Sequence, residues 1–166
     1  MTTAQALIPE FDREMANTRQ VLERIPDDKL DWKAHPKFNS IGWVACHIAE
    51  MAGWIEGILT TDSFDVNPPG GPAYATPTFK STKEILASFD QGVAGARKAL
   101  ESISDADFEK NWSLLNAGET WISMPRTQMV RTFSISHLIH HRAFLCCYLR
   151  MNDIKVPGMY GPGGDD

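Results

Sequence analysis

Three of the five histidines in the sequence lie close together, at His137, His140 and His141. The run around them is apolar at helical spacing, and at about 100° per residue it places His137 and His141 in the middle of the face that should be buried. Spacing i, i+4 aims both rings at one point, which is how a helix offers two nitrogen ligands to a metal ion. His140 falls about 60° away, at the edge of that face. The run therefore predicts a pair of metal ligands on one helix.

A metal held by two imidazoles needs a further ligand from elsewhere in the chain. His47 is the natural candidate because it lies on a second segment with helical spacing, whereas His35 precedes a proline in a predicted loop. The alternative is that each histidine packs in the core and bonds a main-chain carbonyl. Two imidazoles in register, with a third on another helix, favour a metal. Glu50, one turn from His47, is a possible base or ring partner, but we expect an exposed helix glutamate.

Composition and charge limit the class of protein. The chain has 166 residues, of which 43% are hydrophobic, enough for one domain with a substantial core. Its 16 basic and 21 acidic residues form no cationic run, which argues against nucleic acid or a membrane as partner. Residues 1–4 lack the features of a secretion signal, and the three cysteines form no CxxC pair. We expect one cytoplasmic domain over residues 1–166.

Four segments repeat apolar residues at helical spacing, and they must position the histidines. Thr2 begins a possible capping box, but Pro9 interrupts the pattern, so we expect the first regular helix to begin only near Ile8. Ser40 is suited to cap the second helix, and Ser81 has the form of a capping box for the third. The expected helices cover residues 8–25, 41–58, 82–103 and 125–150.

The segments between these helices carry their own signals. Prolines in residues 60–80 forbid regular structure, and a connection of this length is either a lid over a nearby site or an ordinary surface excursion. Two short apolar runs about Gly118 suggest a small hairpin before the last helix. The tail from Val156 should lie along the surface with Tyr160 as its anchor. The expected fold is an all-α four-helix bundle, a fold that commonly builds metal sites between facing helices.

The last expected helix is apolar on both of its faces. The face opposite the histidine pair carries Ile135, Ile139, Ala143 and Cys146. Burial on both sides would follow from a homodimer contact, or from the hairpin or a loop of the same chain. We interpret Cys146 as a packing residue, because it points away from His141.

Three motifs occur together in this chain. The first surrounds His47 in Trp43-Val44-Ala45-Cys46-His47, the second is the run 137–142 followed by Tyr148-Leu149-Arg150, and the third is the ending with Tyr160-Gly161-Pro162. Together they closely resemble the DinB/YfiT-like family of bacterial damage-inducible proteins over nearly the whole chain. The resemblance implies a four-helix bundle, frequently dimeric, with a divalent metal on three histidines, which it maps to His47, His137 and His141. Phe144 here replaces a polar side chain of many relatives.

The first hypothesis is a divalent-metal-dependent enzyme. Three neutral imidazoles around a zinc or nickel ion leave at least one position open. A bound water or an incoming thiol would then be activated as the nucleophile toward a small-molecule substrate. The resemblance implies a thiol S-transferase that uses a low-molecular-weight thiol, or a hydrolase. Apolar walls would come from Trp43, Trp54, Phe144 and Tyr148.

The second hypothesis is a non-catalytic module for metal binding, stress response or ligand binding. It is favoured by the lack, in the sequence, of a convincing acid or base beside the ligands. A fourth protein ligand would indicate a structural metal, whereas an open position would favour catalysis.

Overall fold

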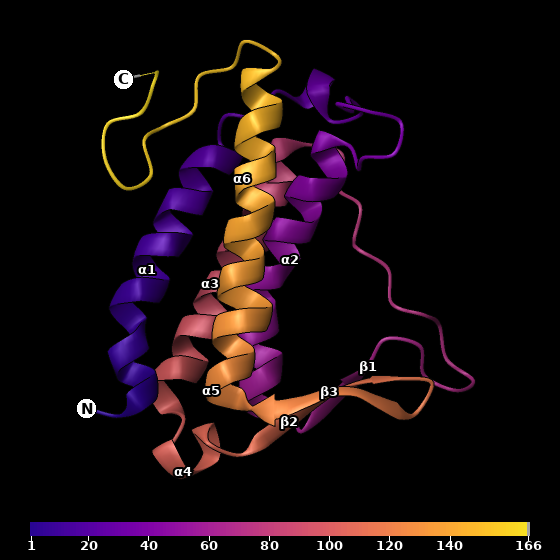
Figure 1. Cartoon of the computed structure of the whole chain (residues 1–166), viewed down its shortest axis with the longest axis vertical. Coiled ribbons are helices and arrows are strands. Elements are labelled where there is room, and N and C mark those ends of the chain that lie inside the picture. The colour runs from indigo at the N-terminus through magenta and orange to yellow at the C-terminus, as the bar shows by residue number, and fades with distance from the viewer. Residues whose placement is uncertain (166) are drawn as a thin grey trace.

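The computed structural model describes residues 1–165, which form a bundle of four long helices with a small sheet at one end (Figure 1). The first three are α1 (Thr3–Leu22), α2 (Ile41–Thr60) and α3 (Thr82–Ser102). The fourth runs without a break through α5 (Arg126–Met129), the π-helical stretch η2 (Val130–Ser136) and α6 (His137–Arg150). Short turns of helix, η1 (Asp27–Lys29) and α4 (Asp105–Phe108), lie in the connections. The predicted helical bundle is confirmed.

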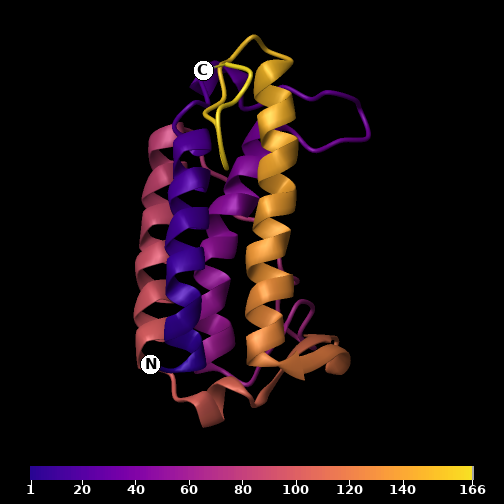
Figure 2. The same cartoon turned by 60° about the vertical axis from the view of Figure 1, so that its left-hand side comes forward.

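The helices run up, down, down and up, so that sequence neighbours are not always antiparallel. Figures 1 and 2 show α1 beside α3, and α2 beside both α3 and the last helix. The two consecutive down helices, α2 and α3, are parallel, which requires a long connection to return the chain to its starting end. The contacts Asp12–Arg97 and Arg19–Asp90 make α1 and α3 antiparallel, and Glu10–Arg131 and Glu14–Arg142 make α1 parallel to the last helix. The contacts His47–His141 and Trp54–Phe133 make α2 antiparallel to the last helix. Gly53 and Gly92 join the parallel helices α2 and α3.

The start of α1 differs from the expectation. The capping box forms as predicted, because the Thr2 hydroxyl accepts from the Gln5 amide at 3.1 Å and the Gln5 side chain accepts from the Thr2 amide at 3.0 Å. The helix begins at Thr3, so the expected start near Ile8 is wrong, and Pro9 lies inside the helix. The cap and the burial of Ala4 and other apolar side chains in the first turns offset the main-chain bond that a proline cannot donate.

The other two predicted caps are present. The Ser40 hydroxyl accepts from the Trp43 amide, and the Ser81 hydroxyl accepts from the Glu84 amide, each at 3.2 Å. The carboxylate of Glu84 does not complete the box at Ser81, because it accepts from the amide of Lys80 at 2.9 Å. Each hydroxyl satisfies one of the free amides at its helix N-terminus.

Glycines set the close approach of the two parallel helices. A Cβ atom added to Gly92 would lie 2.8 Å from the main-chain nitrogen of Gly53, closer than real side chains come. Only a residue without a side chain fits there. The absence of side chains at Gly53 and Gly92 lets α2 and α3 pack closely at this point.

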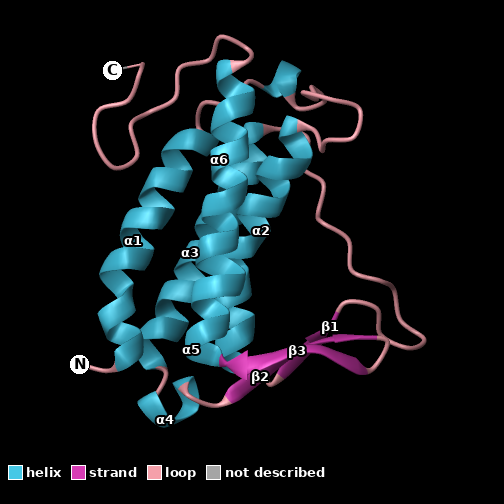
Figure 3. Cartoon of the chain, in the orientation of Figure 1, coloured by secondary structure: helices cyan, strands magenta, loops and turns pink. Residues whose placement is uncertain are grey.

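The small sheet contains the expected hairpin and one strand that was not expected (Figure 3). Strands β2 (Asn111–Asn116) and β3 (Glu119–Pro125) pair antiparallel, and Ala117 and Gly118 both have positive φ in the turn, as tight hairpin turns require. Strand β1 (Ser63–Asp65) pairs parallel with β2, so the expectation of no regular structure in residues 60–80 is wrong for this stretch. The pairing spans about fifty residues, and the prolines begin only after β1.

A buried ion pair fixes the last helix to α1 and holds the tail. Arg142 donates to the carboxylate of Glu14 at 2.7 Å, and both side chains are almost fully buried. The Tyr160 hydroxyl donates to the same Glu14 oxygen at 2.9 Å and accepts from Arg142 at 2.7 Å. Tyr160 therefore anchors the tail, as expected, with its ring exposed and its hydroxyl inside the network.

The outer face of the last helix is only partly covered within one chain. Ile135 is buried, Ile139 and Cys146 are half-buried, and Ala143 is exposed. The homodimer stays a prediction. Within residues 1–165, none of the helices combines the length and the apolar character needed to cross a membrane.

Candidate metal centre

Three histidines from two helices converge near the middle of the bundle. His47 lies on α2, and His137 and His141 lie one turn apart on α6. One ring nitrogen from each lies within 4.8 Å of the other two, and the Nε2 atoms of His137 and His141 are 3.0 Å apart. The ring centre of His47 is 4.8 Å from that of His141 and 5.3 Å from that of His137. The structure thus brings together the three histidines selected from the sequence.

The donor set fits a divalent metal. Nitrogen atoms bound to a tetrahedral zinc ion lie about 3.3 Å from one another, given Zn–N distances of about 2.0–2.1 Å, so the His137–His141 pair is close to that spacing. Imidazole nitrogen suits zinc and nickel alike. Among residues 1–165 the group comprises these three side chains, with no cysteine or carboxylate in it.

Burial keeps two of these rings in the form that binds metal. It is the main cause that lowers the pKa of His141 to about 4, and the neighbouring rings of His47 and His137 add to it. The pKa of His137 is lowered for the same first reason, partly offset by a hydrogen bond to the main chain of Phe133. Because both values lie below the usual 6.5, the two imidazoles are neutral at pH 7 and have a lone pair to offer.

Tryptophans cover two sides of the group. Trp43 stacks on His47 with ring centres 4.8 Å apart, and Trp54 meets the edge of His47 at 5.4 Å and lies 5.8 Å from His137. These rings limit water access and hold the His47 side chain in place.

The other two predicted wall residues lie farther along α6. Phe144 contacts His140 at 4.8 Å between ring centres, and Tyr148 is buried against Trp32 at 5.7 Å. Phe144 and Tyr148 continue a row of rings from the histidines toward the C-terminal end of α6. Their role in a substrate pocket, like that of Trp43 and Trp54, stays a prediction.

Glu50 lies one turn from His47 on α2. Its side chain is only 13% exposed, so the expectation of an exposed helix glutamate is wrong. Its Oε1 lies 2.8 Å from Nδ1 of His47 and also accepts a hydrogen bond from the Tyr74 hydroxyl. The i, i+3 spacing of His47 and Glu50 was a visible signal. The burial was not visible, because it depends on a loop distant in the sequence.

That loop, residues 66–80, runs along α2 on the side that carries His47 (Figure 1). The Thr76 hydroxyl is 3.4 Å from Nδ1 of His47, and the Phe79 amide donates to the sulfur of Cys46. Burial and the bond to Glu50 raise the pKa of Tyr74, so its hydroxyl is a donor at pH 7. Of the two interpretations of this segment, the contacts favour a cover over the site.

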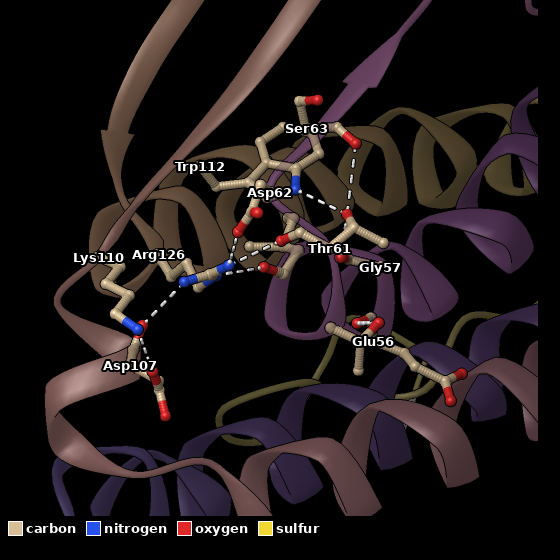
Figure 4. A network of polar contacts seen from close by, with 11 residues as sticks. Glu56, Gly57, Thr61, Asp62, Ser63, Asp107, Lys110, Trp112 and Arg126 are labelled. Carbon is tan, nitrogen blue, oxygen red and sulfur yellow. Dashed lines mark hydrogen bonds and ion pairs between the residues drawn. The ribbon is translucent and has the colours of Figure 1, made fainter.

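A cavity of about 440 Å³ lies elsewhere, at the sheet end of the bundle, and Arg126 is among its lining residues. The Arg126 guanidinium donates to the main-chain oxygens of Ile58, Thr61 and Asp107 and to the carboxylate of Asp62, as Figure 4 shows in part. The bonds to Ile58 and Thr61 satisfy carbonyls at the end of α2, where no helical partner remains. Arg126 therefore stabilises the junction of bundle and sheet.

The fold and the histidines define a class: a helical-bundle protein with a three-histidine group, on facing helices, that could hold a metal ion. More narrowly, the chain belongs to the DinB superfamily, whose family model matches residues 10–145. The resemblance seen in the sequence is confirmed.

Two solved structures share the fold. A DinB-like protein from Bacillus cereus ATCC 10987 aligns with a TM-score of 0.71 at 21% identity, over 94% of this chain and 97% of that one. A DinB-like protein from Bacillus subtilis, YjoA, aligns with a TM-score of 0.69 at 15% identity, over 93% of this chain and 97% of its own. At these identities the likeness shows the fold alone. No curated protein matches the chain.

Proposed function

We propose that this protein is a divalent-metal-dependent enzyme in which His47, His137 and His141 bind zinc or nickel. The observation that carries the proposal is the group of three imidazoles from two helices, with nitrogens within 4.8 Å of one another and no fourth protein ligand in the group among residues 1–165. Three-ligand sites leave a position for water or substrate, as catalytic sites do.

The chemistry follows from the ligand set. A divalent ion held by neutral imidazoles lowers the pKa of a bound water to about 7 or binds a thiol as thiolate. Trp43 and Trp54 exclude water from two sides of the group, which strengthens the electrostatic interactions within it. We infer a thiol S-transferase or a hydrolase that acts on a small molecule.

A second candidate is a metal-binding module without turnover. It is supported by the state of Glu50, the carboxylate beside His47, which already bonds both His47 and Tyr74. A carboxylate engaged twice is poorly placed to accept a proton from a substrate. A bound metal with no reaction would favour this candidate.

Metal analysis of protein purified without a polyhistidine tag tests the proposal. We expect about one zinc or nickel ion per chain after loading and dialysis, and loss of that ion in His137→Ala. His140→Ala is the matched control, because His140 lies on the same helix outside the group, and it should keep the metal. Uptake that is unchanged in His137→Ala would contradict the assignment.

Turnover is tested separately. Metal-loaded protein is screened with low-molecular-weight thiols and electrophilic acceptors, and with ester and amide substrates. His47→Ala is the inactive control. Product formed by the wild type and not by this variant supports the enzyme, and full loading with no product in either screen supports the module.

A further inference from the structure

One carboxylate links a histidine of the group to the loop that covers it. Oε1 of Glu50 accepts from the Tyr74 hydroxyl and lies 2.8 Å from Nδ1 of His47. A carboxylate oxygen only accepts hydrogen bonds, so His47 must carry its proton on Nδ1. In the neutral His47 ring the lone pair is then on Nε2, the nitrogen left free to bind a metal.

The surroundings hold this arrangement in place. The side chains of His47 and Glu50 are 8% and 13% exposed, so the bond between them is formed largely away from water, where hydrogen bonds are stronger. Trp43 stacks on the His47 ring, and Trp54 meets its edge. Nδ1 of His47 contacts Glu50 at 2.8 Å and the Thr76 hydroxyl at 3.4 Å, so Glu50 is the closer and stronger acceptor.

The loop reaches the same oxygen from outside. Its ends are fixed, at one end by the Val66 amide, which donates to Leu115 of the sheet, and at the other by Lys80, whose amide donates to Glu84 of α3. Between these ends, Tyr74 contacts both Glu50 and the ring of Trp54, with ring centres 6.4 Å apart. The middle of the loop is thus attached to the carboxylate that orients His47.

We propose that Glu50 is the positioning residue that presents Nε2 of His47 to the metal, and that Tyr74 couples this contact to closure of the loop 66–80. The inference rests on the proposed metal site. A His47 ring that gives up electron density at Nε2 donates more strongly from Nδ1. The Glu50 carboxylate is then held in the position from which it accepts the Tyr74 hydroxyl. By linkage, closure of the loop raises metal affinity as much as metal binding favours closure.

The proposed role of Glu50 in orienting His47 is tested by zinc affinity and by ¹⁵N NMR of the imidazoles in metal-free protein. Glu50→Ala should weaken zinc binding about 10–100-fold, measured by competition with a chelator, and should remove the preference of His47 for the Nδ1–H tautomer. Glu50→Gln retains an acceptor oxygen, so it should keep the tautomer and lose less affinity. Glu56→Ala, an exposed glutamate on the same helix, is the matched control and should bind zinc as the wild type does.

The proposed coupling of the loop to the site through Tyr74 is tested by hydrogen exchange of residues 66–80 with and without zinc. In the wild type we expect zinc to slow exchange in this segment. Tyr74→Phe keeps the ring and loses the hydroxyl, so the slowing should largely disappear while zinc affinity falls only about 2–5-fold. Zinc-dependent protection that persists in Tyr74→Phe would overturn the coupling.

The outcomes distinguish loss of the positioning role of Glu50 from absence of the metal site itself. Wild-type zinc affinity and an unchanged tautomer in folded Glu50→Ala would overturn the positioning role and leave the metal site standing. If that variant does not fold, Glu50→Gln decides, and loss of the Nδ1–H tautomer there contradicts the inference. A wild type that binds no zinc and no nickel contradicts the proposed function and this inference together.

Discussion

His141 and Arg142 are neighbours in the chain, yet they belong to two polar clusters of opposite kind. His141 faces α2, with its ring centre 4.8 Å from that of His47, and its Nε2 lies 3.0 Å from Nε2 of His137 on the same helix. Arg142 faces α1, where it donates to the carboxylate and carbonyl of Glu14, to Thr18 and to Tyr160. One cluster pairs opposite charges, and in the other two histidine rings face each other nitrogen to nitrogen.

The difference separates a structural site from a candidate ligand site. Around Arg142, donors meet acceptors and the buried charge is neutralised, so the cluster is complete as it stands. Around His141, like groups face one another, and burial lowers the pKa of that ring rather than supplying a counter-charge. Such an arrangement gains most from a cation that accepts the free lone pairs.

Removal of the buried charge pair should have the largest effect on stability. Arg142→Ala removes the buried counter-charge that lies 2.7 Å from the Glu14 carboxylate, which should cost about 3–5 kcal/mol of the free energy of unfolding. Urea titration measures the loss. Arg150→Ala, which removes an exposed pair with Asp165, is the control and should cost far less stability than Arg142→Ala. A small change in Arg142→Ala would show that the cluster is not structural.

Loss of the tail anchor should have a smaller effect on the same cluster. Tyr160→Phe removes one donor to Glu14 and one acceptor for Arg142, so we expect a loss of about 1.5 kcal/mol. Metal content should not change, because the hydroxyl lies on the α1 side of the last helix. Thermal unfolding and metal analysis of the same sample check both statements. A loss of metal would show that the two clusters are not independent.

The pH dependence of stability tests the burial of the histidine cluster. In metal-free protein the pKa of folded His141 is about 4, below its value near 6.5 in the unfolded chain. The unfolded state therefore takes up the proton first, and this contribution to stability is present above about pH 6.5 and is lost as the pH falls toward about 4. In His141→Ala the decline should be shallower. Urea midpoints at several pH values measure it, and parallel curves for the two proteins would refute it.

The smallest stability change should follow loss of the histidine pair itself. His137→Ala combined with His141→Ala should change the free energy of unfolding of metal-free protein by less than about 1 kcal/mol, because the apolar core of the bundle is untouched. Circular dichroism should show an unchanged helical content. Unfolding of this double variant would make the histidines structural, like Arg142.

The sequence was informative where a pattern is local and less so where contacts are distant. Helical spacing alone placed His137 and His141 on one face, and hydroxyl caps located the starts of α2 and α3. The burial of Glu50 depends on Tyr74, which lies in the long irregular loop that follows β1 and returns to α2. The spacing of apolar residues cannot predict a contact between a helix and an irregular loop.

The other differences have the same kind of cause. Strand β1 forms because β2, far along the chain, offers a free edge, and α1 starts early because its first turns are buried by the bundle. The π-helical turn before His137 has no local signal that we recognise. Tertiary contacts override local propensity in the first two cases.

X-ray absorption spectroscopy of the zinc-loaded protein identifies the atoms that surround the bound ion. If His47, His137 and His141 bind the ion, we expect nitrogen and oxygen ligands at about 2.0–2.1 Å, with the scattering pattern of three imidazoles and one light atom that is not from the protein. Fewer than three imidazoles, a sulfur at about 2.3 Å or a fourth protein ligand would contradict it.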